Sequence, residues 1–333
     1  MAAETRQPCL FFSHGPGAAS LVIRSVFYLV GPTASGKSAV ALELARKIGG
    51  ELINADAFQL YAGLPICTAQ PPVEEQAELP HHLYGCLPMA EVCDAQAYCE
   101  RASKVIREVL GRGRWPIVVG GSGLYVKALT HGLAPLPKGD PQIRERLAGM
   151  TSAERVAELL LLDPQAPENV ALANDRYVTR ALEICLLTGR PQSELRREWA
   201  SHEPEFMGVL LQREREDLYH RINARVLGMV KQGLIDEVQA LGEMSMTAEK
   251  AIGVGDMRAF LRGEATLEEA VAAIQQASRR YAKRQLTWFK RERGFQTVCL
   301  EPDSTATFAV ERILELFPCL QSPPPPSVPS SSI

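Results

Sequence analysis

The chain has 333 residues, of which 46% are hydrophobic and 23% are charged. These values are typical of globular proteins and exclude disordered, collagen-like and coiled-coil chains. The net charge of −3 does not by itself predict a polyanionic partner, although a local basic surface remains compatible with it. A chain of this length predicts about two domains, with cores that need no disulfide or structural metal.

Residues 1–25 predict a loose extension and not an export signal. They carry Glu4 and Arg6, and then a Gly-Pro-Gly at 15–17 where a signal peptide would need an unbroken apolar run. No apolar run is long enough to span a membrane. None of the eight cysteines forms the CxxC pair typical of zinc knuckles and redox sites. We therefore expect a cytoplasmic protein.

A strand, a glycine-rich loop and a helix open the folded part of the chain. Residues 26–30 are apolar, and apolar residues recur at helical spacing after residue 38. Between them, Gly31-Pro32-Thr33-Ala34-Ser35-Gly36-Lys37-Ser38 matches GxxxxGK[ST], the phosphate-binding loop. In such a loop the backbone N–H groups point at phosphate oxygens, Lys37 adds positive charge and Ser38 can hold Mg²⁺. The motif leaves the phosphate compound open.

Two further strands are predicted at 51–55 and 116–119, with a helix at 96–110 between them. This alternation predicts βαβ units and a parallel sheet. Asp56 and Ser122 follow these strands, so both side chains should lie near the phosphate loop at the carboxyl edge of the sheet. There they could accept a proton from a nucleophile and hydrogen-bond a leaving oxygen. A turn-forming role for Asp56 is the structural alternative.

The strand at 116–119 ends in Gly120-Gly121-Ser122-Gly123, where an NTPase would carry a metal-binding acid. This absence weakens the interpretation as a motor ATPase. A glycine pair is compatible with a substrate that approaches the backbone closely, as in small-molecule kinases, and equally with an ordinary tight turn. A small-molecule kinase with a phosphate loop therefore remains an alternative.

The middle of the chain differs from its flanks. Residues 140–205 show helical patterns and no convincing strand, and a further strand is predicted at 207–211. We therefore predict an α/β fold: a parallel-sheet core like that of P-loop NTPases (26–139 and 206–317), with an inserted all-helical domain at 140–205. The remaining residues, 318–333, are rich in Pro and Ser and are predicted to form a disordered tail.

A basic helix is predicted near the end of the core. One arc would carry Arg279, Arg280, Lys283, Arg284, Lys290 and Arg291, and the other would pack through Tyr281, Ala282, Leu286, Trp288 and Phe289. A basic stripe of this kind suits nucleic-acid phosphates, although a solvated basic face is equally compatible. His81 and His82 have no metal-ligating partners at suitable spacing and are expected to form hydrogen bonds in a loop or a pocket.

Taken together, the motifs resemble those of the tRNA dimethylallyltransferase family. The resemblance covers residues 27–293 and rests on ordered motifs along that length. They are GPTASGKS from Gly31, NADAFQLY from Asn54, ICTAQP from Ile66, PHHL from Pro80, VGGSGLYVKAL from Val119, DLYHRINARVLGMVKQGLIDEV from Asp217, AIGVGD from Ala251 and YAKRQLTWFK from Tyr281.

The resemblance implies a reaction and its partners. A dimethylallyl group would pass from dimethylallyl diphosphate to N6 of adenosine 37, beside the anticodon of tRNAs that read codons beginning with U, and give N6-isopentenyladenosine. The enzyme would use Mg²⁺ and act as a monomer on the anticodon stem-loop. No attacking water would need positioning, which explains the missing acid after Val119. A homologue that binds tRNA without catalysis is a further alternative.

The resemblance also implies roles for single residues. Asp56 would accept a hydrogen bond or proton from the adenine N6 amine, and Ser122, in place of the family's threonine, would contact the bridging oxygen of the diphosphate. Lys37, Arg144 and Arg221 would neutralise the departing diphosphate. The target base would have to leave its stack, which is feasible in a single-stranded loop.

Three segments are candidates for RNA contact, and several residues depart from the family pattern. Ala57 replaces the usual serine, Gln70 a lysine, Tyr177 an arginine, and Val254-Gly255 a tyrosine followed by a polar residue. We therefore expect the catalytic activity to be retained and the affinity for RNA to be altered or weaker. The candidate contacts are Asp56, Ala57, Phe58 and Gln59; Arg176, Tyr177, Val178, Thr179 and Arg180; and Lys283 and Arg284.

Overall fold

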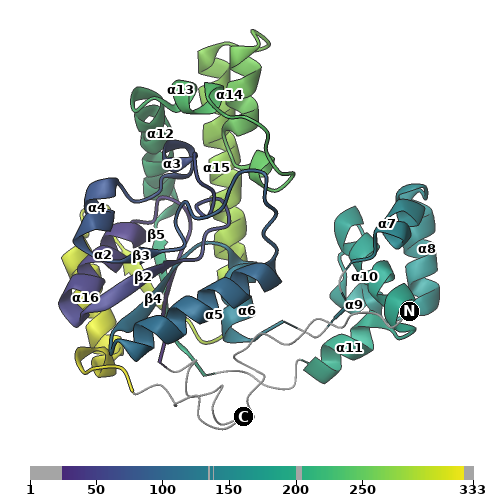
Figure 1. Cartoon of the computed structure of the whole chain (residues 1–333), viewed down its shortest axis with the longest axis horizontal. Helices are drawn as coiled ribbons and strands as arrows, with labels where there is room; N and C mark the ends of the chain where they lie inside the picture. The colour runs from purple at the N-terminus through teal and green to yellow at the C-terminus, as the bar shows by residue number, and fades with distance from the viewer. Residues whose placement is uncertain (1–24, 134–135, 138, 200–204, 326–333) are drawn as a thin grey trace. The chain divides into compact units, whose positions relative to one another are not determined.

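The computed structural model describes residues 25–133, 136–137, 139–199 and 205–325, which form two compact units (Figure 1). The smaller unit takes its described residues from 131–204, and the larger takes them from the segments on either side. The helical insertion expected at 140–205 therefore corresponds to a unit that already begins at His131. The predicted N-terminal extension lies outside the described residues, apart from Ser25.

A six-stranded sheet forms the centre of the larger unit, and every strand pair in it is parallel. This confirms the predicted sheet. In the central strands, Phe27 lies opposite Ile117 on one side and Met207 on the other. In spatial order the strands are β3 (His81–His82), β2 (Gly50–Asn54), β4 (Trp115–Gly120), β1 (Phe27–Val30), β5 (Met207–Arg213) and β6 (Gln296–Leu300).

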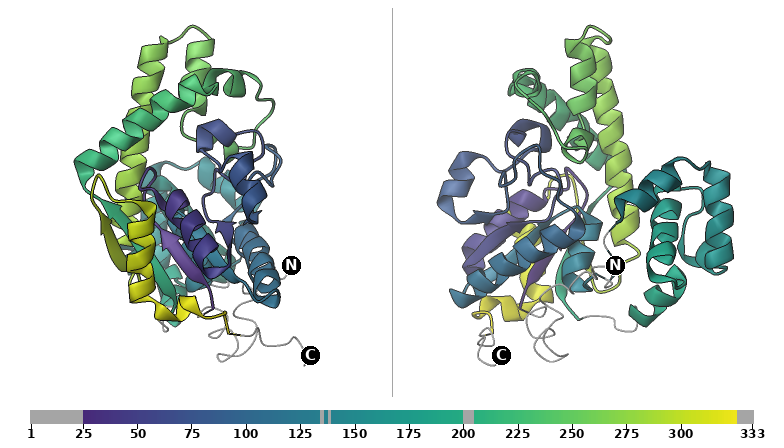
Figure 2. Two further views of the ribbon diagram at one scale, coloured as in Figure 1. Left: turned by 90° about the vertical axis from the view of Figure 1, so that its left-hand side faces the viewer. Right: turned by 45° about the vertical axis from the view of Figure 1, so that its right-hand side comes forward.

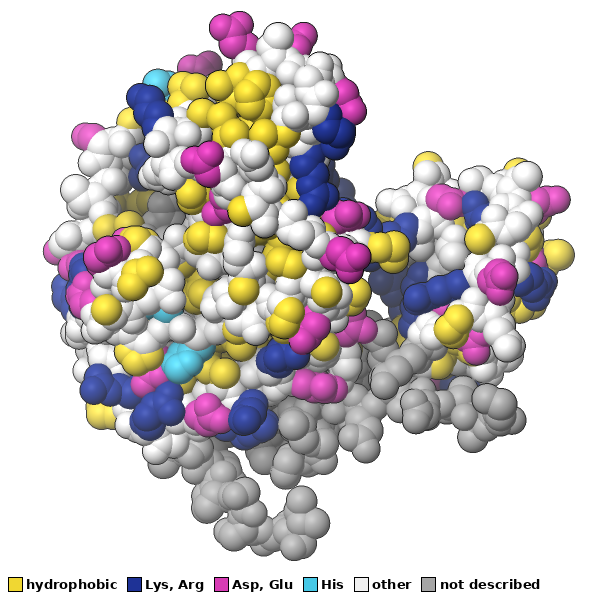
Figure 3. Space-filling model, turned by 45° about the horizontal axis from the view of Figure 1, so that its top comes forward, with side chains coloured by type: hydrophobic (Ala, Val, Ile, Leu, Met, Phe, Trp, Pro, Cys, Tyr) yellow, Lys and Arg dark blue, Asp and Glu magenta, His cyan; other side chains and the backbone are white. Residues whose placement is uncertain are grey.

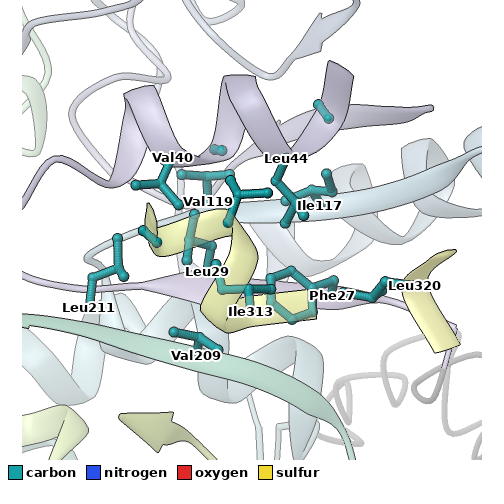
Figure 4. Close-up of a cluster of buried hydrophobic side chains, with 14 of the residues drawn as sticks. Phe27, Leu29, Val40, Leu44, Ile117, Val119, Val209, Leu211, Ile313 and Leu320 are labelled. Atoms are coloured by element: carbon teal, nitrogen blue, oxygen red, sulfur yellow. The ribbon is translucent and has the colours of Figure 1, made fainter. Parts of the chain in front are cut away.

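Helices cover both faces of this sheet. On one face, Val40, Leu44 and Ile313 from two helices pack on Phe27 and Ile117 in a buried apolar cluster (Figure 4). Near-continuous apolar strands are expected in a parallel sheet, because both of its faces are buried. The helices on this first face are α2 (Lys37–Ile48) and α16 (Ala306–Leu316), whereas α5 (Ala95–Gly111) packs against β2 and β4 on the other, beside α6 (Gly123–Thr130).

A helical arm rises beyond the carboxyl ends of the strands (Figure 2). Its first helix follows directly after β5, and its longest helix packs back against the first. The arm contains α12 (Arg215–Lys231), α13 (Leu234–Gln239), the short 3₁₀ helix η1 (Ala248–Lys250), α14 (Val254–Leu261) and α15 (Leu267–Phe289). Two short helices, α3 (Pro65–Thr68) and α4 (Val73–Glu78), lie in the segment between β2 and β3.

The predicted boundary of the C-terminal tail was wrong. Residues Pro318–Gln321 form a 3₁₀ helix, η2, in which Leu320 is only 1% exposed and belongs to the same core as Phe27. The indole N–H of Trp115 donates a hydrogen bond to the carbonyl oxygen of Ser322 (2.8 Å). The apolar side chain of Leu320 finds a core to bury in, despite the Pro/Ser composition that follows it. Residues 326–333 lie outside the described part of the chain.

The end of the basic helix also differs from the prediction. Helix α15 ends at Phe289, and Lys290 and Arg291 continue in a turn instead of a helical stripe. Gly294 follows with a φ of 100°, which suits glycine and redirects the chain into β6. Ala282 and Phe289 are buried, as expected for the packing side, whereas Leu286 and Trp288 are only partly buried.

The described part of the smaller unit contains helices and no strand. Its core joins Leu147, Leu159, Val178 and Leu182 from three of the helices. The second helix begins at a capping box, in which Thr151 and Glu154 satisfy each other's backbone N–H groups. The five helices are α7 (Pro141–Ala148), α8 (Ser152–Leu162), α9 (Ala166–Asn169), α10 (Asp175–Thr188) and α11 (Gln192–Trp199).

An ion cluster at the edge of the sheet leads to a stability prediction. The carboxylate of Glu51, on β2, accepts hydrogen bonds from Arg112 (2.7 Å) and contacts His82 Nε2 (2.7 Å). Burial acts to raise the pKa of Glu51, but its hydrogen bonds with Arg112 and His82 outweigh burial and lower it. We expect Glu51→Gln to reduce the free energy of unfolding by about 2 kcal/mol at pH 7.

The pH dependence of this loss distinguishes the charge from packing. Because the folded pKa is depressed, the stabilisation by Glu51 is complete above the unfolded pKa of about 4.3 and disappears as pH falls through the folded pKa. The difference between parent and variant in urea unfolding should therefore shrink in acid. A difference that stays constant between pH 7 and pH 3 would show that the charge of Glu51 is irrelevant.

Candidate active site

The phosphate loop connects β1 to α2, as the sequence predicted. Ala34 (φ 63°) and Gly36 (φ 93°) are left-handed, so the backbone folds back on itself before α2 begins at Lys37. At Gly31, a Cβ atom would lie 2.9 Å from the carbonyl oxygen of Leu211, so only glycine fits there. The hydroxyl of Ser35 is fully buried and has no hydrogen-bond partner among the described residues. This conformation suits a loop that wraps around an anion.

Three arginine side chains fix successive residues of the loop. Two lie one turn apart on α12, and the third ends β5. The sequence pointed to Arg221 alone, although the four-residue spacing of two arginines on one helix was a usable signal. The hydrogen bonds run from Arg225 Nη1 to Thr33 Oγ1 (2.9 Å), from Arg221 Nε to Ala34 O (3.0 Å) and from Arg213 Nε to Ser35 O (3.0 Å).

Positive charge is concentrated around the loop. Burial lowers the pKa of Lys37 to about 8; Asp56 opposes this shift and Arg225 adds to it. Burial likewise lowers the pKa of Arg221 and of Arg225. Arg213 is paired with Asp217 (2.9 Å) and is itself buried. Buried cations that share so few carboxylates favour a multiply charged anion such as a diphosphate.

The pKa of Lys37 predicts how anion binding depends on pH. Lys37 binds an anion strongly only while protonated, so we expect the affinity for inorganic pyrophosphate to fall as pH rises through about 8. Calorimetric titration between pH 6.5 and 9.5 measures this. Lys37→Arg is the control, because arginine stays protonated while the ligand titrates identically. Identical pH profiles for parent and variant would exclude Lys37 as the titrating group.

Asp56 is held at the end of β2 by a buried asparagine. Asn54 is fully buried; its Oδ1 accepts from the Asp56 N–H (2.8 Å) and its Nδ2 donates to the Asp56 carbonyl (3.0 Å). Asp56 Oδ1 in turn accepts from the N–H of Phe58 (3.1 Å). The turn-forming role considered for Asp56 is therefore present. It occupies Oδ1 and leaves the role of the carboxylate in chemistry open.

Asp56 and the phosphate loop meet at one cavity of about 70 Å³. Its polar lining includes Thr33, Asp56, Arg225 and Tyr281, and its apolar lining comes mainly from α12, α15 and the turn at Ile252. The structure thus brings the phosphate loop and Asp56 together at the carboxyl edge of the sheet, as the sequence predicted. Arg225 and Tyr281 had not been predicted to lie there.

Ser122 lies on the same rim, after β4. Its Oγ accepts a hydrogen bond from the N–H of Ala57 (2.9 Å), which links it to the residue beside Asp56. Tyr281, on α15, also lines the cavity, and burial raises the pKa of this tyrosine. The sequence assigned the aromatic residues of this helix to the core. Tyr281 is instead partly buried and lines the cavity.

The predicted RNA-contact residues of the larger unit differ in their surroundings. Phe58 lines the cavity, and Ala57 beside it is partly buried. Gln59 donates its amide N–H groups to the carbonyls of Thr68 (2.9 Å) and Ala69 (2.8 Å), so this amide holds a loop in place. Lys283 and Arg284 are exposed on α15. Figure 3 shows a column of Lys and Arg side chains along one edge of the helical arm.

In the smaller unit, one RNA-contact prediction was wrong. Val178 is 1% exposed and packs in the helical core, because it occupies the inward face of α10. Arg176 and Tyr177 on the same helix are exposed, and Thr179 is partly buried.

Two arginines of this unit share a buried acid. Glu183 is 1% exposed and pairs with Arg144 (2.9 Å) and Arg180 (2.5 Å). Arg180 also donates to the carbonyl of Pro137 (2.7 Å). The predicted diphosphate ligand Arg144 is thus engaged with Glu183, within a unit separate from that of the phosphate loop.

Two other residues singled out in the sequence have structural roles. Gln70, at the position where the family usually has lysine, donates a hydrogen bond to the carbonyl of Tyr61 (2.8 Å), and Val254 is buried in α14.

Among the described residues, no cluster of His, Cys, Asp or Glu could form a metal site. None of the described helices has the length and apolarity needed to cross a bilayer.

Comparison with known proteins places the chain among tRNA-modifying enzymes. The sequence model of IPP transferase matches residues 59–292. A tRNA dimethylallyltransferase of Akkermansia muciniphila is 39% identical over 86% of this chain and 98% of its own length. Another, from Phenylobacterium zucineum, is 43% identical over 80% of this chain and 89% of its own length.

A solved structure agrees with these relatives. The full-length tRNA isopentenylpyrophosphate transferase of Bacillus halodurans is 34% identical, with a TM-score of 0.66, and the match covers 89% of this chain and 96% of that one. These relatives favour a prenyl-transferring enzyme over the small-molecule kinase considered above. The chain therefore belongs to the IPP transferase family.

Proposed function

We propose that this chain transfers a dimethylallyl group from dimethylallyl diphosphate to N6 of adenosine 37 in the anticodon stem-loop of tRNA. The observation that carries the proposal is the meeting of the cationic phosphate loop and Asp56 at one cavity. The resemblance of the motifs and the names of the relatives support the same reaction.

The diphosphate would bind at the loop. Lys37, Arg221 and Arg225 lie around it, and their charges would stabilise the two phosphates most strongly as the carbon–oxygen bond breaks and negative charge accumulates on the leaving group. The hydroxyl of Ser122 still has a proton to donate, because its Oγ accepts from Ala57. We propose that this O–H donates a hydrogen bond to the bridging oxygen of the diphosphate and keeps its proton.

The adenine would approach from the side of Asp56. A bond forms between N6 and the allylic carbon, the carbon–oxygen bond breaks, and one N6 proton must be lost. The carboxylate of Asp56 is the acceptor of that proton or of the hydrogen bond that precedes its loss. Apolar walls from Ile222 and Val226 suit a hydrocarbon chain and exclude water from it.

Mg²⁺ fits this site only as a partner of the diphosphate. Ser38 presents an exposed hydroxyl at the start of α2, and a single protein oxygen together with phosphate oxygens and water is a usual Mg²⁺ environment. When bound, the ion would neutralise part of the diphosphate charge. The protein residues supply the remaining positive charge and the orientation.

The test combines purified protein, Mg²⁺, dimethylallyl diphosphate and an unmodified anticodon stem-loop with adenosine at position 37. Mass spectrometry of the RNA should show the gain of one C₅H₈ unit, and adding ATP should change nothing. A stem-loop that binds without gaining mass would identify a non-catalytic tRNA-binding homologue. Consumption of ATP that depends on a small-molecule substrate would instead support the kinase.

A further inference from the structure

One buried side chain of α15 touches both loops of the candidate site. Gln285 is 4% exposed. Its Oε1 accepts a hydrogen bond from the N–H of Thr33 in the phosphate loop (2.9 Å), and its Nε2 donates to the carbonyl of Gly121 after β4 (3.0 Å). These partners are 252 and 164 residues away in the sequence, so this contact exists only because α15 returns to the sheet.

The space around Gly121 is filled by this amide. A Cβ atom at position 121 would lie 2.0 Å from Gln285 Nε2 and 3.1 Å from the carbonyl oxygen of Gly31. The amide therefore sits directly between the two loops, with no room for another atom. Any side chain at position 121 would displace this amide from its place between the loops.

Only an amide satisfies both partners. The backbone N–H of Thr33 needs an acceptor and the carbonyl of Gly121 needs a donor, which a carboxylate or a hydrocarbon cannot provide together. Tyr281, one turn earlier on α15, lines the cavity, so the same helix contributes to the site at two positions. Gln285 thus satisfies one backbone donor, the N–H of Thr33, and one backbone acceptor, the carbonyl of Gly121.

We propose that Gln285 is a positioning residue that sets the distance between the phosphate loop and Ser122. Thr33 moves with the loop that would hold the diphosphate, and Gly121 is bonded to Ser122, which would contact the bridging oxygen. Reactions of this kind lose rate steeply when the reacting groups are displaced by about 1 Å. This inference rests on the proposed function and deepens it, since Gln285 itself need not touch either substrate.

The test compares two glutamines of one helix. Gln275 also lies on α15 and donates a hydrogen bond to the carbonyl of Asn223 (3.2 Å), away from both loops. Methionine is nearly isosteric and removes the hydrogen bonds in each case. We expect Gln285→Met to lower kcat at saturating donor and RNA about 100-fold, with a much smaller change in RNA KM. Gln275→Met should leave both unchanged. Equal kcat values for these two variants at matched melting temperatures would overturn the proposal.

If Gln285→Met does not fold, a second pair of variants tests the same contact. Gly121→Ala should be strongly impaired in the parent, because its methyl group collides with the amide. In a Gln285→Ala background the collision with the amide is gone and the 3.1 Å approach to the Gly31 carbonyl oxygen remains, so Gly121→Ala should lower kcat much less than in the parent. Full additivity of the two changes would contradict the proposed contact.

Pyrophosphate binding separates failure of this inference from failure of the proposed function. If the parent forms no prenylated RNA, the proposed function fails. Gln285→Met should nevertheless weaken the affinity for inorganic pyrophosphate about tenfold relative to Gln275→Met, because the phosphate loop loses a contact to Thr33. Unchanged pyrophosphate affinity in that case would overturn the role of Gln285 in positioning the loop.

Discussion

Replacing Asp56 by asparagine is expected to lower kcat for RNA prenylation by about 10³-fold, within the range for loss of a general base. Asparagine retains the Oδ1 that accepts the Phe58 N–H, so the turn at the end of β2 should persist. Only the negative charge and the capacity to take a proton are lost. The affinity for inorganic pyrophosphate, which binds at the loop, should change little.

Single-turnover measurement of RNA mass checks this, with Asp94→Asn as the matched control. Asp94 is also an aspartate whose side chain accepts a backbone N–H, from Ala97 (2.9 Å), but at the start of α5. The control should retain the parent's rate. If Asp56→Asn stays within tenfold of the parent while Asp56→Ala collapses, the residue serves the turn and not the chemistry.

The sequence was sufficient for those features that depend on local pattern and sheet topology. Short apolar runs at 26–30 and 116–119, each followed by glycine, favour buried strands, and parallel strands bring their carboxyl ends to one edge. That rule predicts Asp56 and Ser122 near the phosphate loop from the sequence alone. The short strand β6 was missed because only two of its five residues, Val298 and Leu300, are buried.

Features that depend on long-range packing could not be predicted. Gln285 and Arg225 reach the phosphate loop from helices that are distant in sequence. The spacing of Arg225 from Arg221 was a usable signal, but no local pattern indicates that either side chain contacts Thr33. The prediction that Val178 contacts RNA was wrong for a simpler reason. The stretch 176–180 covers more than one helical turn, so at least one of its side chains must face the core. The burial of Leu320 was not predicted, because the average composition of a Pro/Ser-rich segment does not reveal one apolar residue that packs in the core.

Replacing Lys37 by methionine is expected to lower kcat/KM for the donor by about 10³-fold, comparable with loss of a principal transition-state contact. The arginines would not compensate, because each donates to a loop residue: Arg225 to Thr33, Arg221 to Ala34 and Arg213 to Ser35. Within the described part of the chain, Lys37 Nζ has only a long contact, to the carbonyl of Pro32 (3.4 Å), so its charge is the one most readily turned toward a phosphate.

The loss should divide unequally between binding and catalysis. Charge on the leaving group grows as the carbon–oxygen bond breaks, so a cation at the loop stabilises the transition state more than the ground state. We therefore expect kcat to fall further than pyrophosphate affinity does. Lys47→Met, in the exposed last turn of the same helix α2, is the matched control and should behave as the parent. Equal losses in affinity and in kcat/KM, with kcat unchanged, would limit Lys37 to holding the donor, and the arginines would then have to stabilise the departing diphosphate.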